Sequence, residues 1–334
     1  MNKSSYTYRD SCLAFLFSLV AFLITSLVFS LIVSSIASSS GQEASDILSL
    51  PTTSIISSLL SELAFFSTFI IYTRSNKKKV FKDSAFSCKV GLGLGSLMVL
   101  FGFAIVLCSL NFTGLFSYIF SSFANSEAPS IGLPLDTFPQ FLLGVLVLAV
   151  LPAICEELIF RGIILNGLFK RFKPFLAIVI ASALFALIHM SVYLTIHQFI
   201  LGLELGLVLY LTGNLAYCII LHFANNFLVV LSNYLFKDNF PLEITSWGLP
   251  QVLIAIGAFL LGVGITILFV KFLARKKLYD KNTFALEGEN ESICEDVDKS
   301  GTLAQRITDK VATTMLLVSV AFCMLLWITS SFGG

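Results

Sequence analysis

Charged residues are scarce in this chain. Only 12% of its 334 residues are Asp, Glu, Lys or Arg, whereas 57% are hydrophobic. A soluble globular domain carries about 25% charged residues, and the mean hydropathy here is +0.91. This shortage of charge excludes an aqueous globule. It indicates a polytopic membrane protein, because each bilayer crossing needs about 20 mainly apolar residues.

Three further absences narrow the class of protein. The net charge of +1 comes without a cationic face, which argues against a nucleic-acid partner. None of the seven cysteines falls in a segment expected outside the membrane, so no disulfide framework is implied. We find no internal repeat of the kind that marks many secondary transporters. The first apolar run is also too long for the core of a signal peptide, so we expect a retained span.

Nine apolar runs are long enough to cross a bilayer and predict an all-α, polytopic transmembrane helix bundle. They cover approximately residues 12–36, 54–72, 88–110, 139–164, 174–192, 196–212, 215–236, 250–273 and 311–331. Of the 21 lysines and arginines, Lys237 alone falls in a connection expected outside, and Arg161 lies within a span. The others occupy every second connection. By the positive-inside rule this asymmetry predicts the N-terminus in the cytoplasm and the C-terminus outside.

The chain divides into three expected regions. Residues 1–137 form an N-terminal transmembrane region of about three spans with external loops, and residues 138–236 form a central region. Residues 237–334 hold the last spans, joined by an acidic cytoplasmic loop at about 274–310. Single carboxyl groups also occur within spans, at Glu62 and Glu204. They follow no pattern, so helix packing with satisfied hydrogen bonds is favoured over a proton relay.

The fourth span carries Glu156, Glu157 and Arg161 in the run Leu-Pro-Ala-Ile-Cys-Glu-Glu-Leu-Ile-Phe-Arg. Inserting an ionisable group at this depth costs about 2.5–3.5 kcal/mol, so a functional explanation is preferred. Positions four apart share a helix face. We therefore expect an ion pair between Glu157 and Arg161, which leaves Glu156 without that partner.

Two more pairs with the same spacing follow. Phe185 precedes His189 in the fifth span, and His222 precedes Asn226 in the seventh. At about 1.5 Å of rise per residue, counting from the cytoplasmic ends of the helices brings these groups close to the depth of Glu156. Four polar groups from three helices could therefore converge on one buried site.

The three motifs together resemble the CAAX-protease and bacteriocin-processing (CPBP, or Abi) family of intramembrane peptidases. That family has the signature E-E-x-x-x-R, F-x-x-x-H and H-x-x-x-N/D, and all three motifs stand here in order across residues 138–236. The catalytic residues that the resemblance implies are Glu156, His189, His222 and Asn226, with Glu157 and Arg161 as supports. Glu156 would be the base that activates water, assisted by His189. His222 and Asn226 would stabilise the oxyanion.

The need for a cofactor stays open. Glu156, His189 and His222 offer two imidazoles and a carboxylate, which are ligand types of catalytic Zn²⁺. However, the chain has no H-E-x-x-H helix, in which two ligands lie one turn apart with the base between them. A metal-free, glutamate-activated water is an equal alternative.

These features predict an intramembrane endopeptidase in the cell membrane that cleaves a peptide or a membrane-associated protein. A bacterial plasma membrane and the processing of a secreted peptide or bacteriocin follow by analogy alone. The alternatives are a non-catalytic membrane protein that confers bacteriocin immunity and an ion-coupled transporter, which the missing repeats disfavour. His197, outside all three motifs, is expected to have only an interfacial role.

Overall fold

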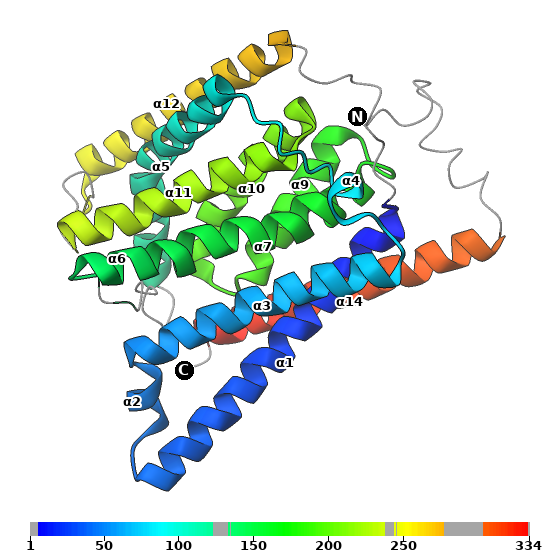
Figure 1. The fold of residues 1–334 in the computed structure, drawn as a ribbon. Helices are drawn as coiled ribbons and strands as arrows, with labels where there is room; N and C mark the ends of the chain where they lie inside the picture. The colour runs from blue at the N-terminus through cyan, green and yellow to red at the C-terminus, as the bar shows by residue number, and fades with distance from the viewer. Residues whose placement is uncertain are drawn as a thin grey trace.

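The computed structural model describes residues 6–122, 133, 135–237, 244, 246–276 and 303–332. These residues form helices and connections with no strand, which confirms the expected all-α class (Figure 1). The α-helices are α1 (Tyr8–Ser40), α2 (Ala44–Leu48), α3 (Pro51–Ser75), α4 (Val80–Asp83), α5 (Leu92–Ser121), α6 (Phe138–Gly144), α7 (Leu151–Ile159), α8 (Asn166–Leu168), α9 (Pro174–Ile188), α10 (Val192–Thr212), α11 (Leu215–Phe236), α12 (Leu249–Lys276) and α14 (Leu303–Phe332). Two π-helices, η1 (Val145–Val150) and η2 (Phe160–Leu165), flank α7.

Eight of the nine expected spans are long and apolar enough to cross a membrane among the described residues. The expected fifth span differs, because α9 has 15 residues and ends at Ile188. Met190 has a positive φ of 48°, which breaks the helix just after His189. The protein is therefore a multi-pass helix bundle with eight full-length candidate spans and one shorter apolar helix. The side of the membrane that each terminus occupies stays a prediction, and residues 277–302 of the acidic loop lie outside the described residues.

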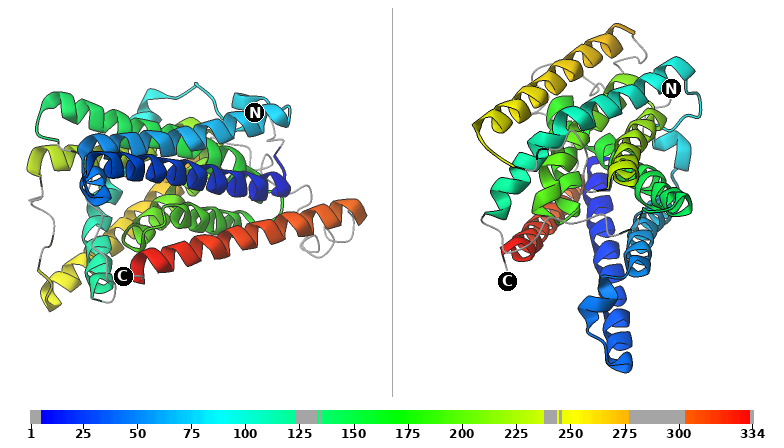
Figure 2. Two further views of the ribbon diagram at one scale, coloured as in Figure 1. Left: turned by 90° about the horizontal axis from the view of Figure 1, so that it is seen from below. Right: turned by 90° about the vertical axis from the view of Figure 1, so that its left-hand side faces the viewer.

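The helices form three groups. The continuous rod from α6 to α8 lies with α9, α10 and α11 in the middle of the molecule, and α11 packs against α7 and α10. On one side, α1 contacts α3 and α14, and α3 packs against α7. On the other side, α5 contacts α10, α11 and α12. Figure 2 shows that the end of α1 next to α2 extends beyond the other helices.

The α6 to α8 rod departs from regular α geometry on both sides of α7. Pro152 follows η1, and because proline has no N–H and its ring crowds the carbonyl four residues earlier, a wider turn relieves that contact. At the other end, Asn166 Nδ2 donates to the carbonyl oxygens of Arg161 at 2.8 Å and Gly162 at 3.1 Å. Single π turns inside α-helices frequently mark functional sites. Here they bracket the segment that carries Glu156 and Glu157.

Helices α9 and α10 approach closely at two glycines. A Cβ atom at Gly202 would lie 2.8 Å from Cβ of Ser182, and one at Gly206 would lie 2.7 Å from Cγ2 of Ile178. Real Cβ contacts are not that short, so larger residues would push the helices apart. Both glycines thus serve close packing of α9 against α10. This packing also brings the carbonyl of Gly202 within reach of the buried polar groups of the rod.

Candidate active site

The carboxylate of Glu157 links two helices of the central group. Its Oε1 accepts hydrogen bonds from Arg161 Nη1 at 2.8 Å and from His222 Nδ1 at 2.9 Å. All three residues are buried, with exposed fractions of 0–1%. Arg161 Nη2 donates to the Gly202 carbonyl at 3.2 Å. The expected pairing of Glu157 with Arg161 is therefore present. The pair also bonds to α10 through the Gly202 carbonyl and to α11 through His222.

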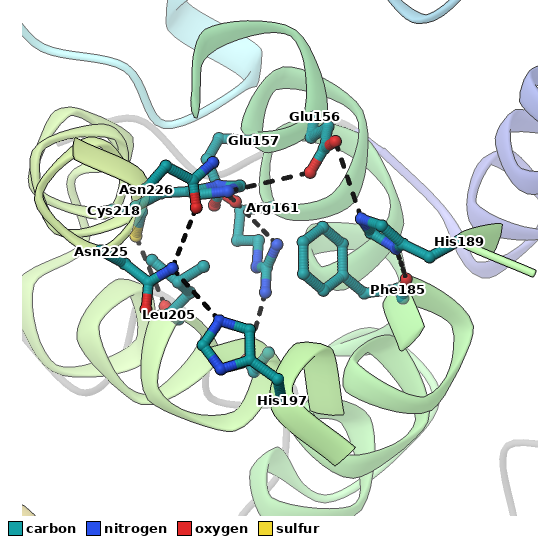
Figure 3. Close-up of polar contacts among 12 residues, drawn as sticks. Glu156, Glu157, Arg161, Phe185, His189, His197, Leu205, Cys218, Asn225 and Asn226 are labelled. Atoms are coloured by element: carbon teal, nitrogen blue, oxygen red, sulfur yellow. Dashed lines mark hydrogen bonds and ion pairs between the residues drawn. The ribbon is translucent and has the colours of Figure 1, made fainter. Parts of the chain in front are cut away.

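Phe185 lies at the centre of this arrangement (Figure 3). The Arg161 guanidinium lies 4.5 Å from the centre of its ring. The rings of His189 and His222 pack edge-on against Phe185, with centroid distances of 5.0 Å and 5.9 Å. His189 Nδ1 lies 2.7 Å from the Phe185 carbonyl oxygen, one of the last carbonyls of α9. The four-residue spacing in F-x-x-x-H thus orients the imidazole in two ways, by ring packing and by a hydrogen bond.

Glu156 faces both imidazoles. Its Oε1 lies 3.8 Å from His189 Nε2, and its Oε2 lies 3.9 Å from His222 Nε2. A carbonyl oxygen only accepts, so the bond to Phe185 places a proton on Nδ1 of His189. In the neutral imidazole, Nε2 then carries the lone pair that faces Glu156. Oε2 of Glu156 is buried and has no hydrogen-bond partner among the described residues.

Asn226 enters the site through a different contact. Asn225 Nδ2 donates to Asn226 Oδ1 at 2.9 Å and lies 3.4 Å from His197 Nε2. Figure 3 shows Asn225 between Asn226 and His197. Because the Asn226 oxygen is engaged, its amide N–H₂ is the end left to act as a donor. His197, which the sequence places outside the motifs, therefore contacts Asn225, the neighbour of Asn226. No spacing within one helix could have revealed this contact between α10 and α11.

The three candidate metal ligands do not form a metal site as they stand. Among the described residues, no group of three or more His, Cys, Asp or Glu side chains is placed to hold a metal ion. Nδ1 of His189 is engaged by Phe185 and Nδ1 of His222 by Glu157, so the Nε2 atoms are the ring nitrogens that face Glu156. Metal-binding histidines are commonly held through their other ring nitrogen in this way, so these two contacts do not argue against a metal.

A cavity of about 250 Å³ gives the site an open side. Glu156, His189 and Pro152 line one wall of the cavity, and residues of α1 and α3 line the other. The side chains of Glu156 and His189 are therefore not sealed within the bundle. A substrate could reach the carboxylate from this direction.

Comparison with known proteins agrees with this geometry. Residues 138–228 match the family model described as type II CAAX prenyl endopeptidase Rce1-like. The matched segment runs from the start of α6 into α11 and includes all three motifs. No curated protein and no solved structure matches the chain. Residues 138–228 are thus similar to the CAAX-protease family of intramembrane peptidases.

Proposed function

We propose that this protein hydrolyses a peptide bond in a peptide or membrane-associated protein, using a water molecule that Glu156 activates. One observation carries the proposal. Glu156 is a buried carboxylate, 7% exposed, that faces the Nε2 atoms of two imidazoles at 3.8 Å and 3.9 Å. Each imidazole is held in place through its Nδ1 atom. A structural ion pair needs no such arrangement, because Glu157 already neutralises Arg161.

The separations around Glu156 suit a shared water molecule. They are longer than a direct hydrogen bond, and one water oxygen can contact a carboxylate and an imidazole across such a gap. Glu156 would take a proton from the water as its oxygen attacks the scissile carbonyl carbon. His189, adjacent through Nε2, would orient the water. The same proton would then pass to the leaving amine as the C–N bond breaks.

Donors for the oxyanion would come from α11. The Asn226 amide N–H₂ can donate to the developing oxyanion, because Asn225 engages its oxygen. His222 can do the same from Nε2 when that atom carries a proton. The hydrogen bond from Nδ1 to Glu157 fixes its ring, as a carboxylate fixes the histidine of a serine protease. Preorganised donors of this kind typically contribute about 10²–10³ in rate each.

Co-expression tests this function. The protein is produced together with candidate peptide precursors, and the products of wild type and Glu156→Gln are compared by mass spectrometry. The variant keeps shape and volume but removes the proton acceptor, so turnover should fall by about 10²–10⁴. Glu204→Gln is a matched control, because Glu204 is also a buried carboxyl group, 6% exposed, on a membrane helix. It should cleave like wild type.

If Glu156→Gln cleaves normally, the peptidase proposal is wrong. The same strains can be scored for immunity to an added bacteriocin. Immunity that persists in Glu156→Gln, with no cleavage in any strain, would favour the non-catalytic binding protein. Substrate identity follows from the precursor that wild type shortens and the variant leaves intact.

A further inference from the structure

A second carboxyl group lines the cavity beside Glu156. Glu62, on α3, and the serines Ser57, Ser58 and Ser61 form the wall opposite Glu156 and His189. Helix α3 lies outside the matched segment 138–228. Its packing against α7 brings Glu62 to the candidate active site. The sequence alone indicated a carboxyl group satisfied by helix packing.

Glu62 is not satisfied in this way. It is 8% exposed, and its buried Oε2 has no hydrogen-bond partner among the described residues. A buried carboxyl oxygen without a partner is costly, on the order of 1–3 kcal/mol. The described residues that line the cavity include no lysine or arginine. The oxygen is therefore available to accept a hydrogen bond from a molecule that enters the cavity.

The shape and chemistry of the wall favour an organic cation. An ammonium group carries three donors and no acceptor, which matches one carboxyl oxygen and neighbouring serine hydroxyls. The apolar part of an organic cation would pack against Phe22 and Phe65, which also line the cavity. Their rings are stacked with centroids 6.2 Å apart. Glu156 adds a second carboxyl group to the same cavity, so a positive charge would be attracted from both walls.

We propose that Glu62 and the serines of α3 form a subsite for a basic side chain, lysine or arginine, of the substrate. This proposal rests on the proposed peptidase function and adds specificity to it. A substrate anchored by its charge at α3 would present nearby backbone to Glu156 on the facing wall. Glu62 would thereby select which bond is cleaved without acting on the bond itself.

A binding experiment tests the subsite without any cleavage. The melting temperature of the purified full-length protein in lipid nanodiscs is measured with n-butylammonium chloride, with sodium chloride at equal ionic strength, and with the neutral analogue 1-butanol. Butylammonium should raise the Tm of wild type, and 1-butanol should not. Glu62→Gln should weaken butylammonium binding about tenfold or more, because a charged hydrogen bond is lost. Glu204→Gln, which alters a buried carboxyl group lining a separate cavity between α5, α10 and α12, should bind like wild type.

Equal effects of butylammonium and 1-butanol on wild type would overturn the proposal, as would an unchanged response in Glu62→Gln. If Glu62→Gln is poorly folded, the wild-type comparison still decides, and Glu62→Asp supplies a charged variant with a shorter reach. A cleavage arm then uses the precursor identified above. Replacing its basic residue nearest the cleaved bond by norleucine should lower kcat/KM about tenfold or more for wild type and much less for Glu62→Gln. If Glu156→Gln still cleaves the precursor, the proposed peptidase mechanism is wrong. The butylammonium measurement does not depend on cleavage and would remain valid.

Discussion

His222 Nδ1 lies 2.9 Å from Glu157 Oε1, an oxygen that also accepts a hydrogen bond from Arg161 at 2.8 Å. One carboxylate oxygen of Glu157 thus connects the buried guanidinium of Arg161 to the imidazole of His222 on α11. The ion pair expected from four-residue spacing is therefore also what orients a candidate catalytic histidine. Stability and activity should respond together when this contact is broken.

Arg161→Ala should lower both folded yield and activity. Removing the guanidinium leaves Glu157, 0% exposed, as a buried charge without its cation, a loss of about 3–5 kcal/mol in proteins. A thermal or denaturant unfolding curve recorded in detergent measures this loss of stability. Arg161→Lys is the matched control, because it keeps the charge but loses the planar fork that reaches Glu157 and Gly202 together. If Arg161→Ala folds and cleaves like wild type, the hypothesis that Glu157 and Arg161 support the catalytic residues is wrong.

Cysteine labelling in intact cells should reach Gln42→Cys and not Lys79→Cys. The lysine and arginine distribution predicts that the connection between α1 and α3 faces outward and that the segment after α3 faces the cytoplasm. Both positions are exposed, and they stand at opposite ends of α3. The native thiol Cys88, also exposed, should stay unlabelled until the membrane is opened. Labelling of Lys79→Cys or of Cys88 in sealed cells would reverse the predicted topology.

The apolar runs and the four-residue spacings could be read from the sequence because they are local. They predicted the spans and the contact between Glu157 and Arg161. The exact ends of helices could not be read in this way. The third span was expected to end at residue 110, but α5 continues to Ser121, since the apolar and aromatic residues beyond residue 110 pack in the structure, for example Phe112 against Phe259.

Contacts between separate helices also could not be predicted from the sequence. Glu62 lies beside the cavity of Glu156, and His197 lies beside Asn225, because separate helices pack together. No periodicity in one segment encodes such a meeting. The Gly202 carbonyl that binds Arg161 is a backbone group and leaves no signature in residue type. From spacing alone the sequence predicts that the candidate residues lie at similar depths, and this depth stays a prediction.

A chelator test addresses the metal alternative. If side chains alone activate the water, activity of the purified enzyme should be unchanged after treatment with a strong chelator and removal of the chelator by gel filtration. Metal analysis of the same sample gives the stoichiometry. Glu156→Gln serves as the reference for complete loss. Activity that disappears on chelation and returns with added Zn²⁺ would show that Glu156, His189 and His222 rearrange to bind a metal.

The last prediction separates the roles of the two asparagines and His197. Asn226→Ala should lower kcat by about 10²–10³, with KM little changed, because an oxyanion donor acts mainly in the transition state. Asn225→Ala should cost less, since it removes only the hydrogen bond that orients the Asn226 amide, at 2.9 Å. His197→Ala should cost least, within about tenfold, because its 3.4 Å contact is with Asn225 and Asn225 still donates to Asn226 without it. Steady-state kinetics on the three folded variants gives this order directly. A larger loss in His197→Ala than in Asn226→Ala would mean that the imidazole of His197 acts on the substrate itself, and the oxyanion role of Asn226 would have to be abandoned.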